Sequence, residues 1–263
     1  MRNMPRMFNL FPLVYERRVF TTVEAIKRTG LPRGLVFKQL AYFQERGLLH
    51  KIRRGLYVPT PYGTGIPADR VSPYVVAGKL RDTYALSYHT ALELHGVAQS
   101  SAYKVYVTTP NPFRTFEFQE VTYRAIKAKP GELEMSGTST TVEDQEIRHT
   151  NREWTIAQCA LRLELAGGLE EYLKSIAGFS YVKFEPLYSA AVFLGRKTLF
   201  NRLGFVLSLF KERWKVADED LSRFRSAKAP HVQYFGAKPG RGRFVKEWNL
   251  MVPHNLEQVI RPA

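Results

Sequence analysis

Few residues of this sequence are of a type, and at a spacing, that would suit acid–base catalysis or metal binding. His89 and Glu93 stand four residues apart on a predicted helix and could share a metal ion, although His95 leaves that face of the helix. A hydrogen-bonded or solvated histidine is far commoner than such a ligand pair. Cys159 lies in an apolar helical segment, where a buried and unreactive thiol is the usual state. We predict no catalytic residue and no cofactor among these side chains.

A second acidic group provides an enzymatic alternative. Glu143, Asp144 and Glu146 precede His149, and carboxylates beside an imidazole can hold the divalent ion of a nuclease. No ordered lysine motif accompanies them, and acidic loops are common. We therefore predict that the chain is not an enzyme and holds no metal. A metal-dependent nuclease directed to nucleic acid by its N-terminal segment is the alternative.

Positive charge is the most unusual property of the chain. Its 263 residues include 39 Lys and Arg against 24 Asp and Glu, which gives a net charge of +15 and an isoelectric point near 9.9. Residues 1–62 hold 12 of the cations and only 3 of the acids, so less than a quarter of the chain carries +9. This concentration predicts that double-stranded DNA binds the N-terminal segment.

A second run of positive charge lies near the C-terminus. Between Leu221 and Lys246 the sequence contains no carboxylate but seven cations, which are Arg223, Arg225, Lys228, Lys238, Arg241, Arg243 and Lys246. Such a run suits a second DNA contact, a surface that holds an acidic partner, or an ordinary solvated face. The sequence alone leaves the three alternatives open.

Local signals predict the elements that position the N-terminal cations. Thr21 and Glu24 form a capping-box pattern, Gly30 ends the helix that follows, and Pro32 suits the first turn of another. Helices are therefore predicted over Leu10–Arg17, Thr22–Arg28 and Arg33–Arg46, and a β-hairpin with a basic turn over Leu48–Val58.

The third predicted helix has two contrasting faces. Val36, Leu40 and Phe43 form a buried stripe, which leaves a small, basic and aromatic outer face. Leu35 and Phe37 are expected to pack against the first helix more than to touch a thymine methyl group. The short helix, tight turn, second helix and basic hairpin predict a winged helix-turn-helix. The predicted DNA-binding residues are Arg33, Lys38 and Tyr42 for base edges, and Lys51, Arg53 and Arg54 for phosphates or the minor groove. A module of this kind that binds only protein is the alternative.

A change in composition divides the chain. Prolines and glycines crowd the nine residues from Pro59 to Pro67, so we predict a DNA-binding domain over 1–62, a linker over 63–72 and a larger domain over 73–263. In the larger domain, helices are predicted over Pro73–Arg81, Leu86–His95, Trp154–Ala166, Gly168–Ile176, Glu185–Leu194 and Leu199–Trp214, and strands over Tyr103–Thr108, Thr115–Glu120, Val121–Lys127 and Thr140–Arg148. Strands grouped between helices predict an α+β fold.

The sequence also indicates a compartment. A single cysteine cannot close an intrachain disulfide, and the N-terminus lacks the pattern of a signal peptide. No apolar run approaches the length needed to cross a bilayer. We expect a soluble protein of the reducing cytoplasm with no membrane partner.

Six segments, in order along most of the chain, carry a resemblance to a known family: Val19–Ala25, Arg46–Leu49, Arg53–Tyr57, Ala85–Gly96, Arg148–Thr155 and Trp248–Pro253. The likeness rests on the order of these segments together with the two-domain length. The chain resembles the AbiEi family of antitoxin transcriptional regulators from type IV toxin–antitoxin and abortive-infection loci.

The resemblance implies two activities. A winged-helix domain would repress its own operon by binding inverted repeats in the promoter, and a C-terminal domain would neutralise a nucleotidyltransferase-like toxin. The resemblance places DNA contact on the outer face of the Arg33–Arg46 helix and on the hairpin that follows, as the residues themselves do. No motif localises a surface for contact with the toxin.

Overall fold

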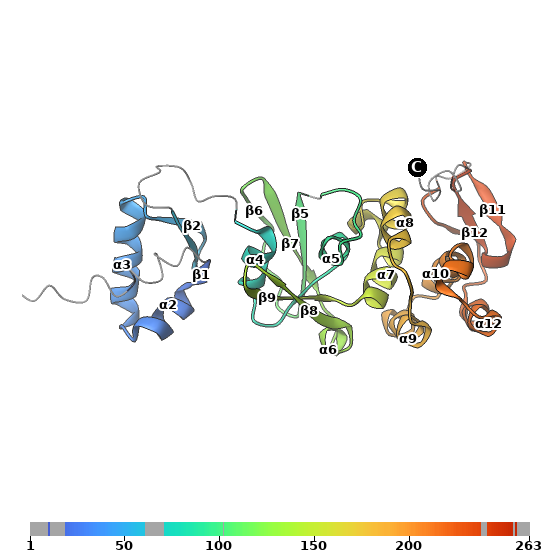
Figure 1. Cartoon of the computed structure of the whole chain (residues 1–263), viewed down its shortest axis with the longest axis horizontal. Coiled ribbons are helices and arrows are strands. Elements are labelled where there is room, and N and C mark those ends of the chain that lie inside the picture. The colour runs from blue at the N-terminus through green and yellow to red at the C-terminus, as the bar shows by residue number, and fades with distance from the viewer. Residues whose placement is uncertain are drawn as a thin grey trace, which may run out of the picture. The chain divides into compact units, whose positions relative to one another are not determined.

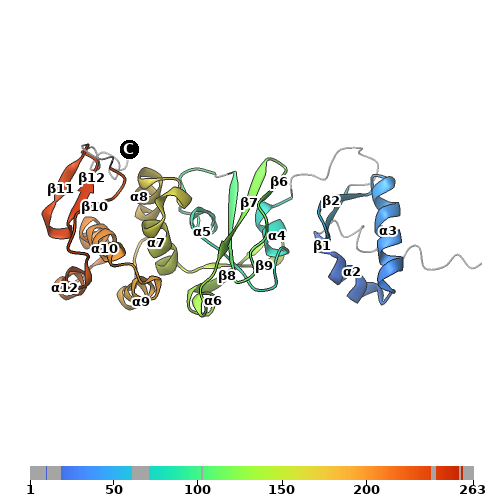
Figure 2. The same cartoon turned by 180° about the vertical axis from the view of Figure 1, so that it is seen from behind.

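The computed structural model describes residues 10, 19–60, 71–101, 103–237, 241–254 and 256, which form helices and three β-sheets (Figure 1; Figure 2 from behind). The predicted α+β class is confirmed. The chain divides into a first unit, made of Met1–Asp82, Glu117–Val121 and Thr141–Gln145, and a second unit, made of the remainder. Leu10 apart, the predicted helix over Leu10–Arg17 lies outside the described residues, as does most of the predicted linker.

The first unit begins with a strand, two helices and a hairpin. Its elements are β1 (Phe20–Thr21), α2 (Thr22–Thr29), α3 (Arg33–Glu45), β2 (Leu49–Arg53), β3 (Leu56–Pro59) and α4 (Pro73–Gly78). The strands form an antiparallel sheet in the order β1-β3-β2. The predicted capping box is present, because the Glu24 amide donates to Thr21 Oγ1 over 3.1 Å and the Thr21 amide donates to Glu24 Oε2 over 2.7 Å. Gly30, with a φ of 63°, ends α2.

One face of α3 closes the core of the first unit. Val36, Leu40 and Phe43 are buried, as predicted, and they pack with Phe20 and Tyr57 of the sheet. The backbone of Thr22 donates to the carbonyl of Gly55 at the hairpin turn over 2.9 Å. The hairpin is therefore fixed to the start of α2, while the opposite face of α3 stays exposed.

A six-stranded sheet runs through the middle of the chain. Its order is β6-β7-β5-β4-β9-β8, with β4 at Ala85–Leu86, β5 at Lys104–Thr109, β6 at Phe116–Phe118, β7 at Val121–Lys127, β8 at Gly137–Val142 and β9 at Gln145–Thr150. Strand β5 pairs parallel to β7, and β4 pairs parallel to β9 and antiparallel to β5. Two turns of this sheet belong to the first unit. They are Glu117–Val121, between β6 and β7, and Thr141–Gln145, between β8 and β9.

Two sequence predictions in this region are wrong. The helix predicted over Leu86–His95 begins only at His89, because Leu86 pairs with Val107 and His149 in the sheet and is fully buried there. The strand predicted over Thr140–Arg148 is a hairpin, since Glu143 and Asp144 both have positive φ and form a two-residue turn. Glycine or asparagine usually marks such a turn, and neither is present here.

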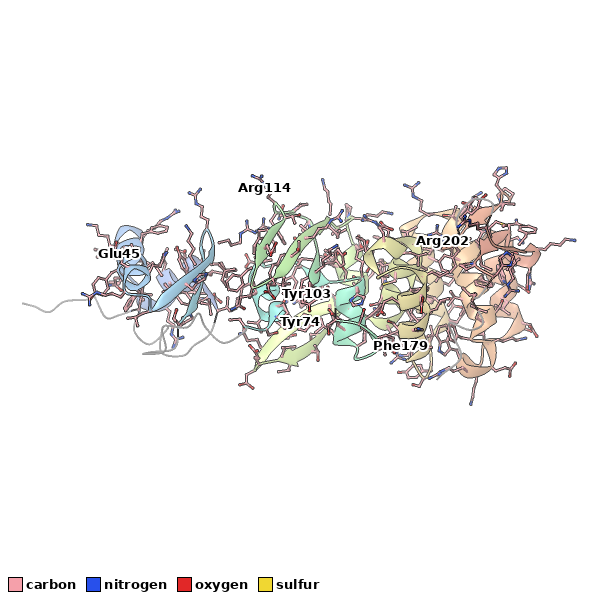
Figure 3. The ribbon with its side chains drawn as sticks, turned by 90° about the horizontal axis from the view of Figure 1, so that it is seen from above. Glu45, Tyr74, Tyr103, Arg114, Phe179 and Arg202 are labelled. Atoms are coloured by element: carbon pink, nitrogen blue, oxygen red, sulfur yellow. The ribbon has the colours of Figure 1, made fainter. Side chains whose placement is uncertain are left out.

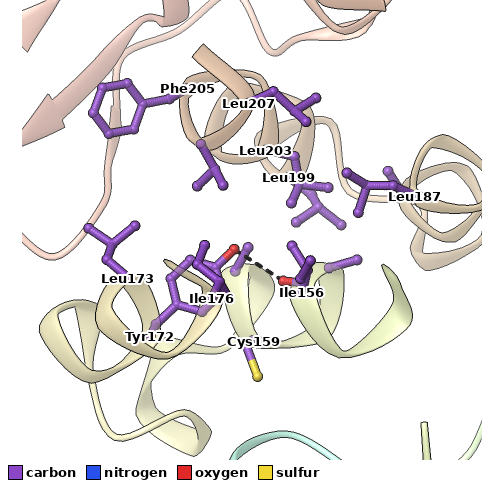
Figure 4. Close-up of a cluster of buried hydrophobic side chains, with 14 of the residues drawn as sticks. Ile156, Cys159, Tyr172, Leu173, Ile176, Leu187, Leu199, Leu203, Phe205 and Leu207 are labelled. Atoms are coloured by element: carbon purple, nitrogen blue, oxygen red, sulfur yellow. Dashed lines mark hydrogen bonds between the residues drawn. The ribbon is translucent and has the colours of Figure 1, made fainter. Parts of the chain in front are cut away.

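Helices make up most of the second unit. They are α5 (His89–Leu94), α6 (Glu132–Ser136), α7 (Arg152–Leu161), α8 (Leu169–Ala177), α9 (Phe184–Leu194), α10 (Lys197–Leu209), α11 (Lys211–Trp214) and α12 (Asp218–Ala227). Helix α7 packs against α8, α9 and α10 (Figure 4). Across that core the Tyr172 hydroxyl donates to the carbonyl of Ile156 over 3.2 Å. Two predicted helices are each interrupted in the structure. The helix predicted over Trp154–Ala166 is α7 followed by a 3₁₀ turn, and the helix predicted over Leu199–Trp214 is α10 followed by α11.

A small sheet closes the second unit. Its order is β10-β12-β11, from β10 (Gln233–Tyr234), β11 (Arg243–Val245) and β12 (Leu250–Val252). Trp248, just before β12, is fully buried, and its ring lies where a β-carbon on Gly204 of α10 would be. Asn201, one turn earlier on α10, donates to the carbonyls of Ala229 and Trp248 over 3.1 and 2.8 Å and accepts from the Ala229 amide over 2.7 Å. These contacts fix the sheet to α10.

Among the described residues, no helix is long and apolar enough to span a membrane.

Candidate nucleic-acid interface

The exposed face of α3 presents cations beside apolar side chains. Arg33 and Lys38 are exposed, and the Arg33 guanidinium lies 5.4 Å from the centre of the Phe37 ring. Leu35 and Phe37 are 39% and 41% exposed, and the predicted first helix against which they were expected to pack lies, Leu10 apart, outside the described residues. A β-carbon on Gly34 would meet no atom within 4 Å, which leaves this end of the helix narrow and accessible.

Tyr42 lies at the edge of the same face. Its ring is half-buried, packs edge-on against Phe43 with the ring centres 5.8 Å apart, and has the Arg46 guanidinium 5.0 Å from its centre. Exposed Glu45 is near the end of the helix (Figure 3). Tyr42 is therefore held in place, with only part of its ring available to a ligand.

The cations of the hairpin differ in exposure. Lys51 and Arg54 are exposed, whereas Arg53 is half-buried next to a register shift between β2 and β3. Burial, and then repulsion from the charge of Arg81, lower the pKa of Arg53. Sequence reasoning missed Arg81. It follows α4, and no motif in the sequence indicates that it lies near the hairpin.

A second contact missed by sequence reasoning connects α4 with α2. Lys79, directly after α4, places its Nζ 2.6 Å from Oε1 of Glu24, the carboxylate of the capping box. One side chain thus both caps α2 and holds a cation from the segment after α4. No spacing signal in the sequence relates two residues so far apart.

The second basic run has carboxylate partners that its own sequence does not contain. Arg223 pairs with Glu185 of α9, and Arg225 pairs with Glu247. Lys228 Nζ donates to the backbone carbonyl of Glu247. The fold therefore brings carboxylates from outside the run onto its α12 half. Arg241, Arg243 and Lys246 are exposed, and Lys238 lies outside the described residues.

His89 is a buried member of a polar cluster. Its Nε2 lies 3.2 Å from Oε1 of Glu171, and its Nδ1 lies 3.7 Å from Oε1 of Glu93. The Glu171 oxygen also accepts from the backbone amides of Gln99 and Ser100 over 2.9 and 3.3 Å. Burial raises the pKa of Glu171, but these hydrogen bonds together outweigh it, so the net pKa is lowered. The cluster fixes the 99–100 loop to α8.

The group proposed for the nuclease alternative is split between exposed and buried positions. Glu143 and Asp144 form the exposed turn between β8 and β9, and Glu146 is exposed. His149 is 3% exposed and its Nδ1 lies 3.0 Å from the carbonyl oxygen of Thr150. Within the described part of the chain, no three His, Cys, Asp or Glu side chains are grouped so that they could hold a metal ion.

His95 and His149 lie next to Thr150, and we expect them to make the folded chain less stable in acid. His95 Nε2 lies 2.9 Å from the Thr150 carbonyl oxygen, and its ring stands edge-on to that of His149 with the centres 4.8 Å apart. Burial first, and then the neighbouring His149, lower the pKa of His95 from 6.5 to about 4. The unfolded chain therefore takes up this proton first. Above about pH 6.5 His95 is uncharged in both states and does not lower the free energy of unfolding. As the pH drops towards 4, protonation of His95 in the unfolded chain lowers the free energy of unfolding by about 3 kcal/mol.

Urea unfolding at a series of pH values, followed by tryptophan fluorescence, measures this effect. The substitution His95→Gln keeps a side-chain amide that can donate to Thr150 and removes the titration. We expect the free energy of unfolding of this variant to change much less between these pH values than that of the parent chain. An identical pH dependence in the two proteins would show that His95 is not the group responsible.

Cys159 is fully buried on α7, and burial raises the pKa of its thiol (Figure 4). The thiol is therefore protonated and shielded, as the sequence predicts, and supplies no nucleophile.

Comparison with known proteins relates the chain to a solved structure. No protein-family model matches the sequence, and no curated protein matches it either. The structure is similar to the crystal structure of the RV2827C protein from Mycobacterium tuberculosis, with a TM-score of 0.61 and 13% sequence identity. The similarity covers 96% of this chain and 93% of that one, so the two proteins share their fold over almost their whole lengths.

Proposed function

We propose that this chain is a DNA-binding transcriptional repressor and the antitoxin of a nucleotidyltransferase-like toxin. The observation that carries the DNA-binding half is the two-sided helix α3, whose buried face closes a core while its exposed face presents Arg33, Phe37 and Lys38. The succession β1, α2, α3, β2, β3 supports a winged helix-turn-helix, in which α3 would be the recognition helix and the hairpin the wing.

In this proposal the helix and the wing do different work. Arg33 and Lys38 meet base edges in the major groove, and the open space at Gly34 lets the helix backbone approach the bases. Lys51 and Arg54 on the wing bind phosphates, which add affinity without sequence choice. The charge of Arg81 adds to that of Arg53 in the positive potential beside the wing, and a bound phosphate would offset the repulsion between the two side chains.

Binding to the DNA upstream of the protein's own gene tests the proposal. We expect Arg33→Ala with Lys38→Ala to weaken binding to this site by about 30-fold or more, because each base contact contributes at least about 1 kcal/mol. Lys51→Ala with Arg54→Ala should weaken binding to all duplexes alike and lower the slope of log affinity against log salt by about 2. Fluorescence anisotropy with a specific and a scrambled duplex measures both effects.

The matched control removes the same charge elsewhere. Arg114 and Lys197 are exposed residues of the second unit, and their double alanine variant loses two cations without altering α3 or the hairpin (Arg114 in Figure 3). It should bind the specific duplex almost as the parent chain does. If this control weakens binding as much as the α3 variant, net charge and not the α3 face determines affinity, and the assignment fails.

The antitoxin half of the proposal is supported by the order of the six resembling segments. A nucleotidyltransferase-like protein encoded next to this gene should arrest growth when it is expressed alone, and co-expression of this chain should restore growth. The variant with Arg33→Ala and Lys38→Ala, expressed from an unrelated promoter, should restore growth equally well, because the proposal assigns neutralisation to the second unit. Arrest that persists with the intact chain would contradict an antitoxin role.

A further inference from the structure

The outer face of the small C-terminal sheet carries a row of exposed apolar side chains. Tyr234 on β10 is paired with Met251 on β12, and Met251 is paired with Phe244 on β11, so the three side chains lie side by side on one face. Tyr234 and Phe244 are 44% and 50% exposed. Leu250, next to Met251, is fully buried on the opposite face. The sheet thus has one face in the core and one aromatic face towards solvent.

This aromatic face is built on a fixed support. Arg202 of α10 donates to the carbonyl of Tyr234 over 3.2 Å and to the carbonyls of Ala160 and Leu161 over 2.8 and 3.0 Å (Figure 3). The Phe235 amide donates to the Met251 carbonyl over 3.0 Å. Because the backbone under the rings is already held, a ligand that stacks on them has little of the protein to order.

Exposed cations stand next to this face. The α12 half of the basic run is engaged by Glu185 and Glu247, but Arg241 and Lys246 are exposed on either side of β11, within three residues of Phe244. The carboxylate near them, that of Glu247, is held by Arg225. Aromatic rings on a sheet with cations at the ends of a strand fit a ligand that has both flat apolar groups and negative charge.

We propose that this face binds single-stranded nucleic acid. Bases stack on Tyr234 and Phe244, and the phosphates between them bind Arg241 and Lys246. The two rings are two strands apart, about 10 Å, which suits bases splayed from an extended backbone. A duplex keeps its base faces inside the stack and cannot make this contact. The site is therefore separate in location and in ligand from the proposed duplex-binding face of α3.

Anisotropy of a labelled oligothymidine of about 12 nucleotides, with the full chain, tests the proposal. The double variant Tyr234→Ala with Phe244→Ala should bind this strand about 30-fold or more weakly, since each stacked base contributes about fivefold or more. Tyr103→Ala is the matched control, because Tyr103 is a 67% exposed aromatic residue outside this sheet (Figure 3). It should change nothing. Tryptophan fluorescence, to which buried Trp248 contributes, verifies that each variant keeps its fold.

Stacking has a signature that charge alone lacks. Phe244→Trp should retain affinity, and the added tryptophan should be quenched by oligothymidine but not by inorganic polyphosphate. The double alanine variant should still bind the specific duplex, whereas Arg33→Ala with Lys38→Ala should still bind the single strand, so this proposal and the proposed repressor function fail independently. Undiminished single-strand binding by the double alanine variant would overturn the proposal. Tighter binding of polyglutamate than of oligothymidine would overturn it in favour of an acidic protein partner.

Discussion

Replacing Gly204 with alanine is expected to lower the free energy of unfolding of the second unit by about 4 kcal/mol or more. A β-carbon at this position would lie 2.0 to 2.5 Å from three ring carbons of Trp248. The ring is fully buried and its Nε1 donates to Ser208 Oγ over 3.0 Å, so it has no free space into which to move. The methyl group must therefore displace either the ring or helix α10.

Tryptophan fluorescence during urea unfolding measures this loss specifically. All three tryptophans, Trp154, Trp214 and Trp248, belong to the second unit, so the signal is blind to the first. The matched control is Gly34→Ala, the same change in the first turn of helix α3, where the methyl group meets open space. Circular dichroism should show that this control stabilises the chain slightly, by at most about 1 kcal/mol, because alanine favours a helix over glycine.

A second-site change keeps the prediction for Gly204 falsifiable if the variant fails to fold. In a Trp248→Leu background the ring is absent, and Gly204→Ala should then cost little. The two substitutions are therefore expected to be strongly non-additive. Equal costs of Gly204→Ala in both backgrounds would show that the ring is not what excludes a side chain.

Asn201→Ala is the second change with a large expected effect, a loss of about 3 to 5 kcal/mol in the free energy of unfolding. Asn201 is fully buried, and it satisfies the Ala229 amide and the Trp248 carbonyl, for which the described residues show no other side-chain partner. Truncation leaves both backbone groups buried without a hydrogen bond, at about 1 to 3 kcal/mol for each, and it also leaves a cavity. Asn201→Asp should be no better, because its carboxylate would face two carbonyl oxygens. Urea unfolding followed by tryptophan fluorescence measures these losses.

Asn249 supplies the matched control. Its side-chain amide also donates to the carbonyl of Ala229, over 3.2 Å, but it is only half-buried and its φ is 49°. Asn249→Gly removes the hydrogen bonds without backbone strain, so a cost of about 1 kcal/mol is expected. If the two asparagines prove equally sensitive, burial is not the reason for the importance of Asn201.

The elements that sequence predicts well are those set by neighbours along the chain. The capping box of Thr21 and Glu24, the Gly30 stop and the stripe of Val36, Leu40 and Phe43 depend on residues within one or two helical turns. The face of α3 proposed for DNA contact follows from that stripe, because burying one side of a helix defines the other. The contacts of Phe37 on that face stay a prediction, since they depend on what lies against the helix.

Features that depend on distant parts of the chain were missed. Leu86 lies in a segment with the pattern of a helix, but its pairing with Val107 and His149 in the sheet decides its conformation. Arg223 lies in a stretch free of carboxylates, but the fold brings Glu185 to it. Arg53 and Arg81 likewise lie far apart in the sequence, and so do Asn201 and the two carbonyl groups to which it donates. No spacing rule connects either pair of segments. Sequence therefore predicts a charge far better than its partner.

The burial of Cys159 makes the native chain inert to thiol-directed reagents. It is the only cysteine in the sequence, it is fully buried, and burial favours its unreactive thiol form. A cysteine introduced at an exposed position such as Val23 or Tyr181 would then be the one residue that maleimide dyes modify. Two such cysteines, one in each unit, would allow energy transfer between dyes to follow the distance between the units while duplex or single-stranded DNA is added, with the native cysteine left in place.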